Sequence, residues 1–129
     1  MAELGISKES VCFIIFKARE FEEIPGSGLV DEGFGGAVVR DDNDATYDEI
    51  KQFIESIDLD EQCDVVALAW VGRGDFDLSE WAEARELARE RHNERTAEYL
   101  LGMPLLADYL QAGLDVFGIS CEDIEEERL

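Results

Sequence analysis

Apolar residues recur at helical spacing along most of this 129-residue chain. The first such stretch places these residues on one helical face: Val11, Ile14, Ile15, Ala18 and Phe21. Ser7 stands just before them, where a serine is favoured as an N-cap. The pattern predicts a first helix over about residues 7–22.

The next segment, residues 24–45, has a different character. It contains Pro25, five glycines and a cluster of acidic residues, which is a composition typical of irregular structure. We expect a Gly-rich acidic loop here. Helical spacing resumes after Asp44 or Thr46, either of which is a suitable cap, and continues to about Ile57.

Residues 59–76 form the most informative stretch, because their apolar side chains cover most of a helix circumference. Asp58 precedes this stretch and Glu61 follows three residues later, which is the spacing of a capping box. A helix that is apolar on nearly every side belongs at the centre of a bundle. We expect it to stop at Gly72 and Gly74, since glycine tolerates a positive φ.

Three further helical segments follow. Asp77 with Glu80 repeats the cap pattern and opens a fourth helix, Asn93 or Thr96 restarts or continues helical spacing, and Pro104 suits the first turn of a last helix that Gly118 ends. Residues 119–129 form an acidic tail. The chain therefore predicts one all-α domain, residues 1–129, with five to six helices in an orthogonal or irregular helical bundle.

The composition supports a single core and no membrane span. Hydrophobic residues make up 46% of the chain, but no apolar run reaches the roughly 18 residues that a transmembrane helix needs. The start of the chain lacks a basic segment followed by a long apolar one, so we expect a cytoplasmic protein. The three cysteines show no metal-ligand or redox-motif spacing, which predicts buried, reduced thiols.

The charge is strongly acidic. Eleven Lys and Arg residues face 32 Asp and Glu residues, for a formal net charge of −21. Such a surface repels nucleic-acid phosphates and anionic membranes and favours a basic partner. We therefore expect no direct nucleic-acid contact and no membrane contact. We also expect moderate salt to raise the melting temperature, because it screens self-repulsion.

Several segments resemble an uncharacterised bacterial family catalogued as domain of unknown function 3775. The segments that carry the resemblance are residues 11–15, 17–21, 60–62, 66–76, 87–92, 96–102 and 104–110. The element Trp70-Val71-Gly72-Arg73-Gly74-Asp75-Phe76 is the most specific of them, and the resemblance extends from Ser7 to Gly118. It implies a compact helical fold and supplies no catalytic residues.

Arg73 is the sharpest candidate for a binding residue. A guanidinium held between two glycines can present its donors to a carboxylate or a phosphate, or it can tie the turn together through Asp75. Trp70 and Trp81 flank the same turn, where they either line a shared pocket or anchor the core.

A second candidate is a basic stripe. Arg85, Arg89 and His92 follow i, i+4, i+7 spacing and share one helix face. This face either receives an anionic molecule or an acidic patch of a partner, or it is a solvated face neutralised by neighbouring glutamates. A single histidine without a cysteine pair supplies too few ligands for a typical metal site, so we expect no metal and no cofactor.

The residues offer no pairing of a nucleophile with a base, so we assign no catalytic residue. The leading hypothesis is a small acidic protein-interaction module without catalytic activity, which binds a basic protein or associates with itself. The alternative is a binder or enzyme acting on a small anionic molecule near residues 72–75. Its candidate ligand-binding residues are Trp70, Arg73, Asp75, Trp81, Arg85, Arg89 and His92.

Overall fold

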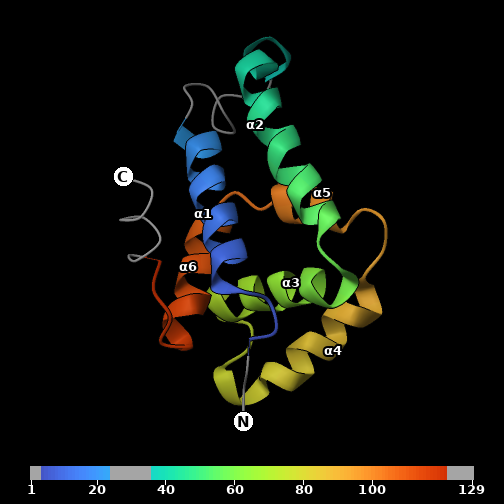
Figure 1. The fold of residues 1–129 in the computed structure, drawn as a ribbon, viewed down its shortest axis with the longest axis vertical. Coiled ribbons are helices and arrows are strands. Elements are labelled where there is room, and N and C mark those ends of the chain that lie inside the picture. Colours follow the sequence, from blue (N-terminus) through green and yellow to red (C-terminus); the bar gives the residue numbers. More distant parts are fainter. Residues whose placement is uncertain (1–3, 24–35, 122–129) are drawn as a thin grey trace.

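The computed structural model describes residues 4–23 and 36–121, with the side chains of residues 21–23 and 36–45 left out of the description. This part of the chain is helical and contains no strand (Figure 1). Its elements are α1 (Lys8–Glu23), α2 (Gly36–Ser56), α3 (Leu59–Arg73), the short 3₁₀ helix η1 (Leu78–Glu80), α4 (Trp81–Arg91), α5 (Thr96–Leu101) and α6 (Leu106–Val116). The predicted all-α class is confirmed.

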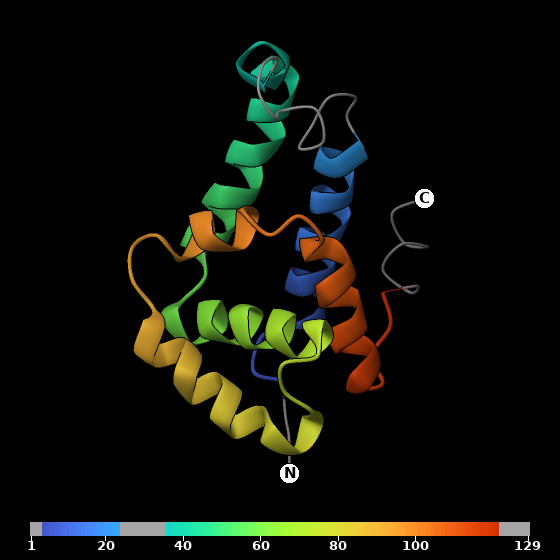
Figure 2. The ribbon, with the colours of Figure 1, turned by 180° about the vertical axis from the view of Figure 1, so that it is seen from behind.

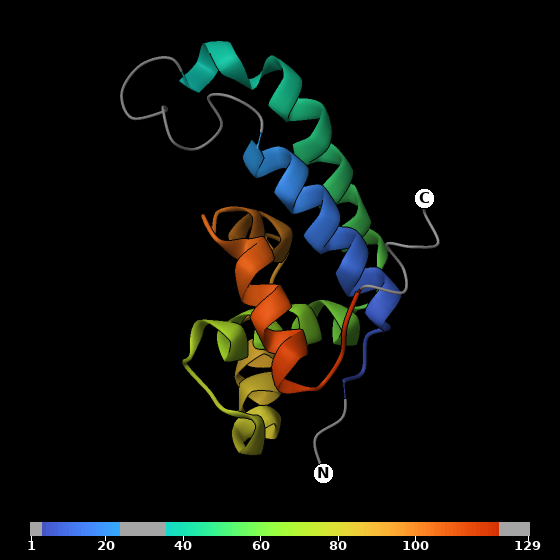
Figure 3. The ribbon, with the colours of Figure 1, turned by 90° about the vertical axis from the view of Figure 1, so that its left-hand side faces the viewer.

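The helices form two groups that cross each other. Helices α1 and α2 run antiparallel as a tall pair, and α3 lies across their lower end (Figure 1). Helix α6 packs against both α1 and α3, as Figure 3 shows from the side. Helix α4 covers the other side of α3, and the segment that leads from α4 to α5 arches outward in Figure 2. Most long-range packing therefore passes through α3.

The predicted helix caps at Ser7 and Asp58 are confirmed in atomic detail. The backbone N–H of Ser10 donates to Ser7 Oγ over 3.1 Å at the start of α1. At the start of α3 the Glu61 N–H donates to Asp58 Oδ1 over 2.9 Å, and the Asp58 N–H donates to Glu61 Oε1 over 3.1 Å. This reciprocal pair is the capping box expected from the sequence.

The prediction of irregular structure up to residue 45 is wrong at its end. Helix α2 begins at Gly36, about ten residues before the expected caps, while residues 24–35 lie outside the described part of the chain. Residues 37–45 contain neither proline nor glycine. Because extending an existing helix adds one hydrogen bond per residue fixed, the amphipathic part of α2 continues through them.

Helix α3 is the core of the protein, as its sequence predicted. Nine consecutive residues, from Cys63 to Val71, are buried. They belong to one hydrophobic cluster with the largest buried side chains of the other helices, which include Ile14, Ile15, Ile50, Ile54, Leu100, Leu106, Leu110 and Leu114. One of the nine is a carboxylate, Asp64, whose partners are described below.

Gly72 has a different role from the predicted one. It is still within α3, whereas the positive φ of 99° that ends the helix belongs to Gly74. A Cβ at Gly72 would overlap the Tyr109 carbonyl oxygen and lie 2.9 Å from the backbone nitrogen of Gly113. Gly72 is required because α6 crosses α3 in backbone contact there. The expectation at Gly118 is confirmed, since its φ is 75°.

The expectation of three reduced thiols is wrong for two of them. Cys12 in α1 and Cys121 after α6 form a disulfide across 109 residues of sequence, with their Cα atoms 5.8 Å apart. That distance lies within the usual range for such bonds. Spacing along the chain cannot reveal this pair, because only the packing of α6 on α1 brings the two residues together. Cys63 is buried and free, as expected.

Candidate functional site

The predicted basic stripe is present, but it holds α4 on α3. Arg85 Nε donates to Asp64 Oδ1 over 2.7 Å, and Arg89 pairs with Asp60 one turn away on α3. His92 Nε2 lies 2.7 Å from Gln62 Oε1. These acceptors are on α3, and they are not the neighbouring glutamates that the sequence suggested. The three basic side chains thus connect the two helices.

Asp64 is the buried member of this arrangement, with 1% of its side chain exposed. Its second oxygen accepts from the backbone N–H of Gly5 over 2.6 Å. Burial raises the pKa of Asp64, although Arg85 and the Gly5 N–H both act to lower it. The desolvation of the carboxylate thus outweighs its attraction to Arg85. The ion pair between Arg85 and Asp64 therefore contributes more to the orientation of α4 than to the stability of the fold.

Arg73 is engaged within its own turn. Its Nε and one terminal nitrogen donate to Asp75 Oδ2 over 2.8 and 2.6 Å. Asp75 raises the pKa of Arg73, and Tyr99 adds to the same shift, so the guanidinium lies close to the phenol. This is the turn-tying arrangement that the sequence analysis weighed against ligand binding.

The two tryptophans do not share a pocket. Trp81 packs edge-on against Phe117, with ring centroids 4.9 Å apart, and the Arg85 guanidinium lies 5.9 Å from its ring. Trp70 lies on the opposite side of α3, where its ring is 5.9 Å from that of Phe76. Trp70 lines an open cavity.

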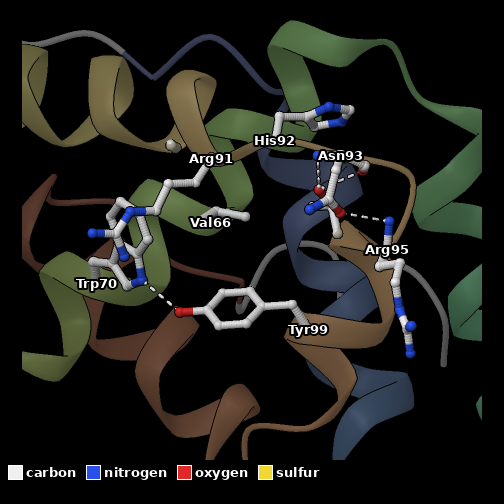
Figure 4. Close-up of a pocket in the computed structure, with 9 residues that line it drawn as sticks. Val66, Trp70, Arg91, His92, Asn93, Arg95 and Tyr99 are labelled. Carbon is white, nitrogen blue, oxygen red and sulfur yellow. Dashed lines mark hydrogen bonds between the residues drawn. The ribbon is translucent and has the colours of Figure 1, made fainter.

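That cavity lies where α3, the end of α4, the segment 92–95 and the start of α5 meet (Figure 4). It has a volume of about 250 Å³. Its lining residues are Val66, Trp70, Ala88, Arg91, His92, Asn93, Arg95, Thr96 and Tyr99. We call this the corner pocket.

The floor of the corner pocket is apolar and its rim is polar. Val66, Trp70 and Ala88 are buried side chains of the packed core. The Trp70 indole N–H donates to the Tyr99 hydroxyl oxygen over 2.9 Å, and Tyr99 itself is 47% exposed (Figure 4). Because Tyr99 accepts this bond, its own hydroxyl proton is available to a ligand.

The polar segment between α4 and α5 is held by its own hydrogen bonds. The Thr96 hydroxyl donates to the Asn93 carbonyl oxygen over 2.9 Å, and Asn93 Oδ1 accepts from the Arg95 backbone N–H over 2.7 Å. These bonds fix the path of the rim without closing the pocket.

The cations at the rim differ in how they are engaged. Arg95 Nε donates to Glu98 Oε1 over 2.8 Å, and the ring of His92 is bonded to Gln62. Arg91 is exposed and forms no hydrogen bond or ion pair with any residue in the described part of the chain. Its side chain extends from the end of α4 along the Trp70 side of the pocket (Figure 4). Among the arginines that line the pocket, Arg91 is therefore the one without a partner in the described part of the chain.

The corner pocket therefore contains two of the residues singled out from the sequence, Trp70 and His92. The other candidates do not line it. The pocket residues that the sequence analysis did not propose as ligand-binding are Val66, Ala88, Arg91, Asn93, Arg95, Thr96 and Tyr99. One available signal was the short polar segment 92–95 between two helices, since binding residues often lie on such connections.

The described residues bring no three potential ligands among His, Cys, Asp and Glu together around one point. None of the described helices has the length and the apolar character that crossing a membrane requires.

Comparison with known proteins defines a family for this chain. Residues 47–119 match a family described as a protein of unknown function, DUF3775, and the match covers more than half of the sequence. The chain belongs to the DUF3775 family. All residues of the corner pocket lie inside the matched region, whereas Cys12 and Cys121 both lie outside it. No curated protein and no solved structure matches the chain.

Proposed function

We propose that this DUF3775 protein is a binding module without catalytic activity that holds an anionic group in the corner pocket. The observation that carries the proposal is the state of Arg91. It is a guanidinium without a partner in the described chain, at the rim of an apolar pocket. A guanidinium offers a fork of donors that matches a carboxylate or a phosphate.

The proposal moves the anion site away from residues 72–75. Arg73 already shares its donors with Asp75, and Arg85 and Arg89 are paired with acids of α3. The charge of each of these guanidiniums is thus already balanced by a carboxylate. At Arg91 an anion displaces water only.

The condition of the potential nucleophiles supports binding rather than catalysis. Cys63 is buried, and burial raises the pKa of its thiol. A thiol that stays protonated is a poor nucleophile. His92 lies in hydrogen-bond contact with Gln62, which leaves one ring nitrogen at most for other work.

Melting temperatures in the presence of anions test the proposal. The native protein and Arg91→Gln are each melted in a panel of organic and inorganic anions at constant ionic strength, with chloride as the reference. Ligand binding to the folded state raises the melting temperature. We expect at least one organic anion to stabilise the native protein and to leave Arg91→Gln unchanged. An equal response of both proteins to every anion would refute the role of Arg91.

A basic protein partner, or a second copy of this chain, is the second candidate. Two observations favour it. The net charge is −21, and among the described residues five large apolar side chains are more than a third exposed, namely Leu59, Leu78, Tyr99, Leu105 and Val116. Light scattering over a wide range of protein concentration tests self-association. A monomer mass throughout would remove that part of the candidate.

We also propose the cytoplasm as the location, as the composition suggests. The pair Cys12 and Cys121 provides the test, because disulfides are rare in that compartment. Because both residues are buried, cells are lysed directly into denaturant that contains an alkylating agent, which traps every reduced thiol. Alkylation of both residues supports a cytoplasmic location, and protection of both contradicts it.

A further inference from the structure

We infer that the ligand of the corner pocket is a small aromatic monocarboxylate, with its carboxylate on Arg91 and its ring against Trp70. This inference rests on the proposed anion-binding function and specifies its ligand. Three properties of the pocket lead to it: its size, its apolar floor and the number of its available cations.

The size excludes very small and very large ligands. Apolar cavities of about 150 Å³ hold a benzene molecule, and pockets for drug-sized molecules begin at about 300 Å³. The corner pocket, at about 250 Å³, lies between these values. It therefore fits one substituted ring or a small bicyclic molecule.

The residues that line the pocket favour a ligand with an aromatic ring. Val66 and Ala88 form an apolar floor, and the rings of Trp70 and Tyr99 lie on two sides (Figure 4). Aromatic side chains favour offset or edge-on contact with another ring. The exposed Tyr99 hydroxyl, which accepts from Trp70, has a proton to donate to a polar substituent of that ring.

The charged groups at the pocket favour a ligand with a single negative charge. One guanidinium, Arg91, lacks a partner in the described chain, since Arg95 is bonded to Glu98. One fork of donors matches one carboxylate. The net charge of −21 repels an incoming anion in proportion to the charge of that anion. A phosphate dianion is therefore repelled about twice as strongly as a carboxylate, and the other arginine that lines the pocket, Arg95, is already bonded to Glu98.

Titration of the native protein followed by NMR tests this inference directly. The side-chain N–H of Trp70 lies at the pocket and that of Trp81 is remote, so the two indole resonances report the site and an internal control in one spectrum. The probes are benzoate, its neutral isostere benzamide, phenyl phosphate, and acetate. We expect benzoate to shift the Trp70 resonance in a saturable way and to leave Trp81 unchanged. Benzamide and phenyl phosphate should bind at least about tenfold more weakly, and acetate should cause no shift.

Two variants with the same change of charge complete the test. Arg91→Gln should weaken benzoate binding at least about tenfold. Arg95→Gln, which lines the same rim but removes an arginine already bonded to Glu98, should change it less than about twofold. Equal binding of benzamide and benzoate, or equal effects of the two variants, would overturn the inference.

The outcomes also separate this inference from the broader proposal. If acetate or phenyl phosphate shifts Trp70 in an Arg91-dependent way and benzoate does not, an anion site exists and the ligand class is wrong. If no anion shifts Trp70, both the anion site and the ligand class are wrong.

Discussion

Replacing Gly72 by alanine should destabilise the protein strongly, although alanine is the better helix former. The new Cβ would overlap the Tyr109 carbonyl oxygen, lie 2.7 Å from the Tyr109 carbonyl carbon and lie 2.9 Å from the Gly113 nitrogen. Carbon atoms pack at about 3.5–4.0 Å, so α6 must retreat from α3 by roughly 1 Å. The obstructing atoms are backbone, so a change of rotamer cannot remove the overlap.

The magnitude follows from two opposing contributions. Overpacking of a core costs about 1–3 kcal/mol, and we expect the upper end because a retreat of that size forfeits a quarter to a half of the dispersion energy of affected contacts. Alanine recovers about 1 kcal/mol of helix propensity. The net loss in the free energy of unfolding is therefore about 2 kcal/mol, or roughly 8 °C in melting temperature.

Urea unfolding, followed by circular dichroism, measures this loss, and two further variants control it. Gly102→Ala places its Cβ at 3.4 and 3.5 Å from the nearest atoms, with φ at −81°, so it should change stability by less than about 0.5 kcal/mol. Gly113→Ala meets Leu68 at 2.6 Å on the same crossing and should act like Gly72→Ala. The double variant should cost less than the sum, because one retreat of α6 relieves both overlaps. A Gly72→Ala protein as stable as Gly102→Ala would refute the close crossing.

Three further measurements test other parts of the structure. Cys12→Ser should lower the free energy of unfolding by about 3–5 kcal/mol, because the bond closes a loop of 109 residues, and a reductant should bring the native protein to the same level. The pKa of Asp64 is raised in the fold, so its contribution to stability is fully present below its unfolded pKa and is lost as pH rises through the folded value. The stability advantage of the native protein over Asp64→Asn should therefore shrink between pH 4.5 and 8, and a growing advantage would contradict the direction of the shift. Moderate salt should raise the melting temperature, since it screens a net charge of −21, and a flat or falling curve would contradict this.

Local signals in the sequence were sufficient to predict most of the helices. The cap at Asp58, the all-round apolar character of α3 and the restart at Thr96 each depend on residues within a few positions of one another. Hydrogen bonds at helix ends and helical periodicity are properties of such short stretches. The first half of α2 was missed because polar residues without a strong stripe carry no such signal.

The candidate site was harder to predict because its residues come from separate helices. Arg85 and Arg89 were correctly placed on one face, but the acids that pair with them, Asp64 and Asp60, are more than 20 residues away. Arg91 lies one or two positions from Arg89 and His92, and no pattern in the sequence distinguishes it from them. Arg91 is a candidate ligand-binding residue because Arg95 and His92 are bonded to other side chains, whereas Arg91 has no such partner in the described part of the chain.

The sequence by itself determined an all-α chain with a buried central helix and an acidic exterior, since both follow from the order of apolar and charged residues. Tertiary structure alone decided the roles of Gly72, of the pair Cys12 and Cys121, and of the rim arginines. The reason is physical. Whether a glycine admits a neighbouring helix, a thiol meets another thiol or a guanidinium stays available depends on distances between segments that only packing brings together.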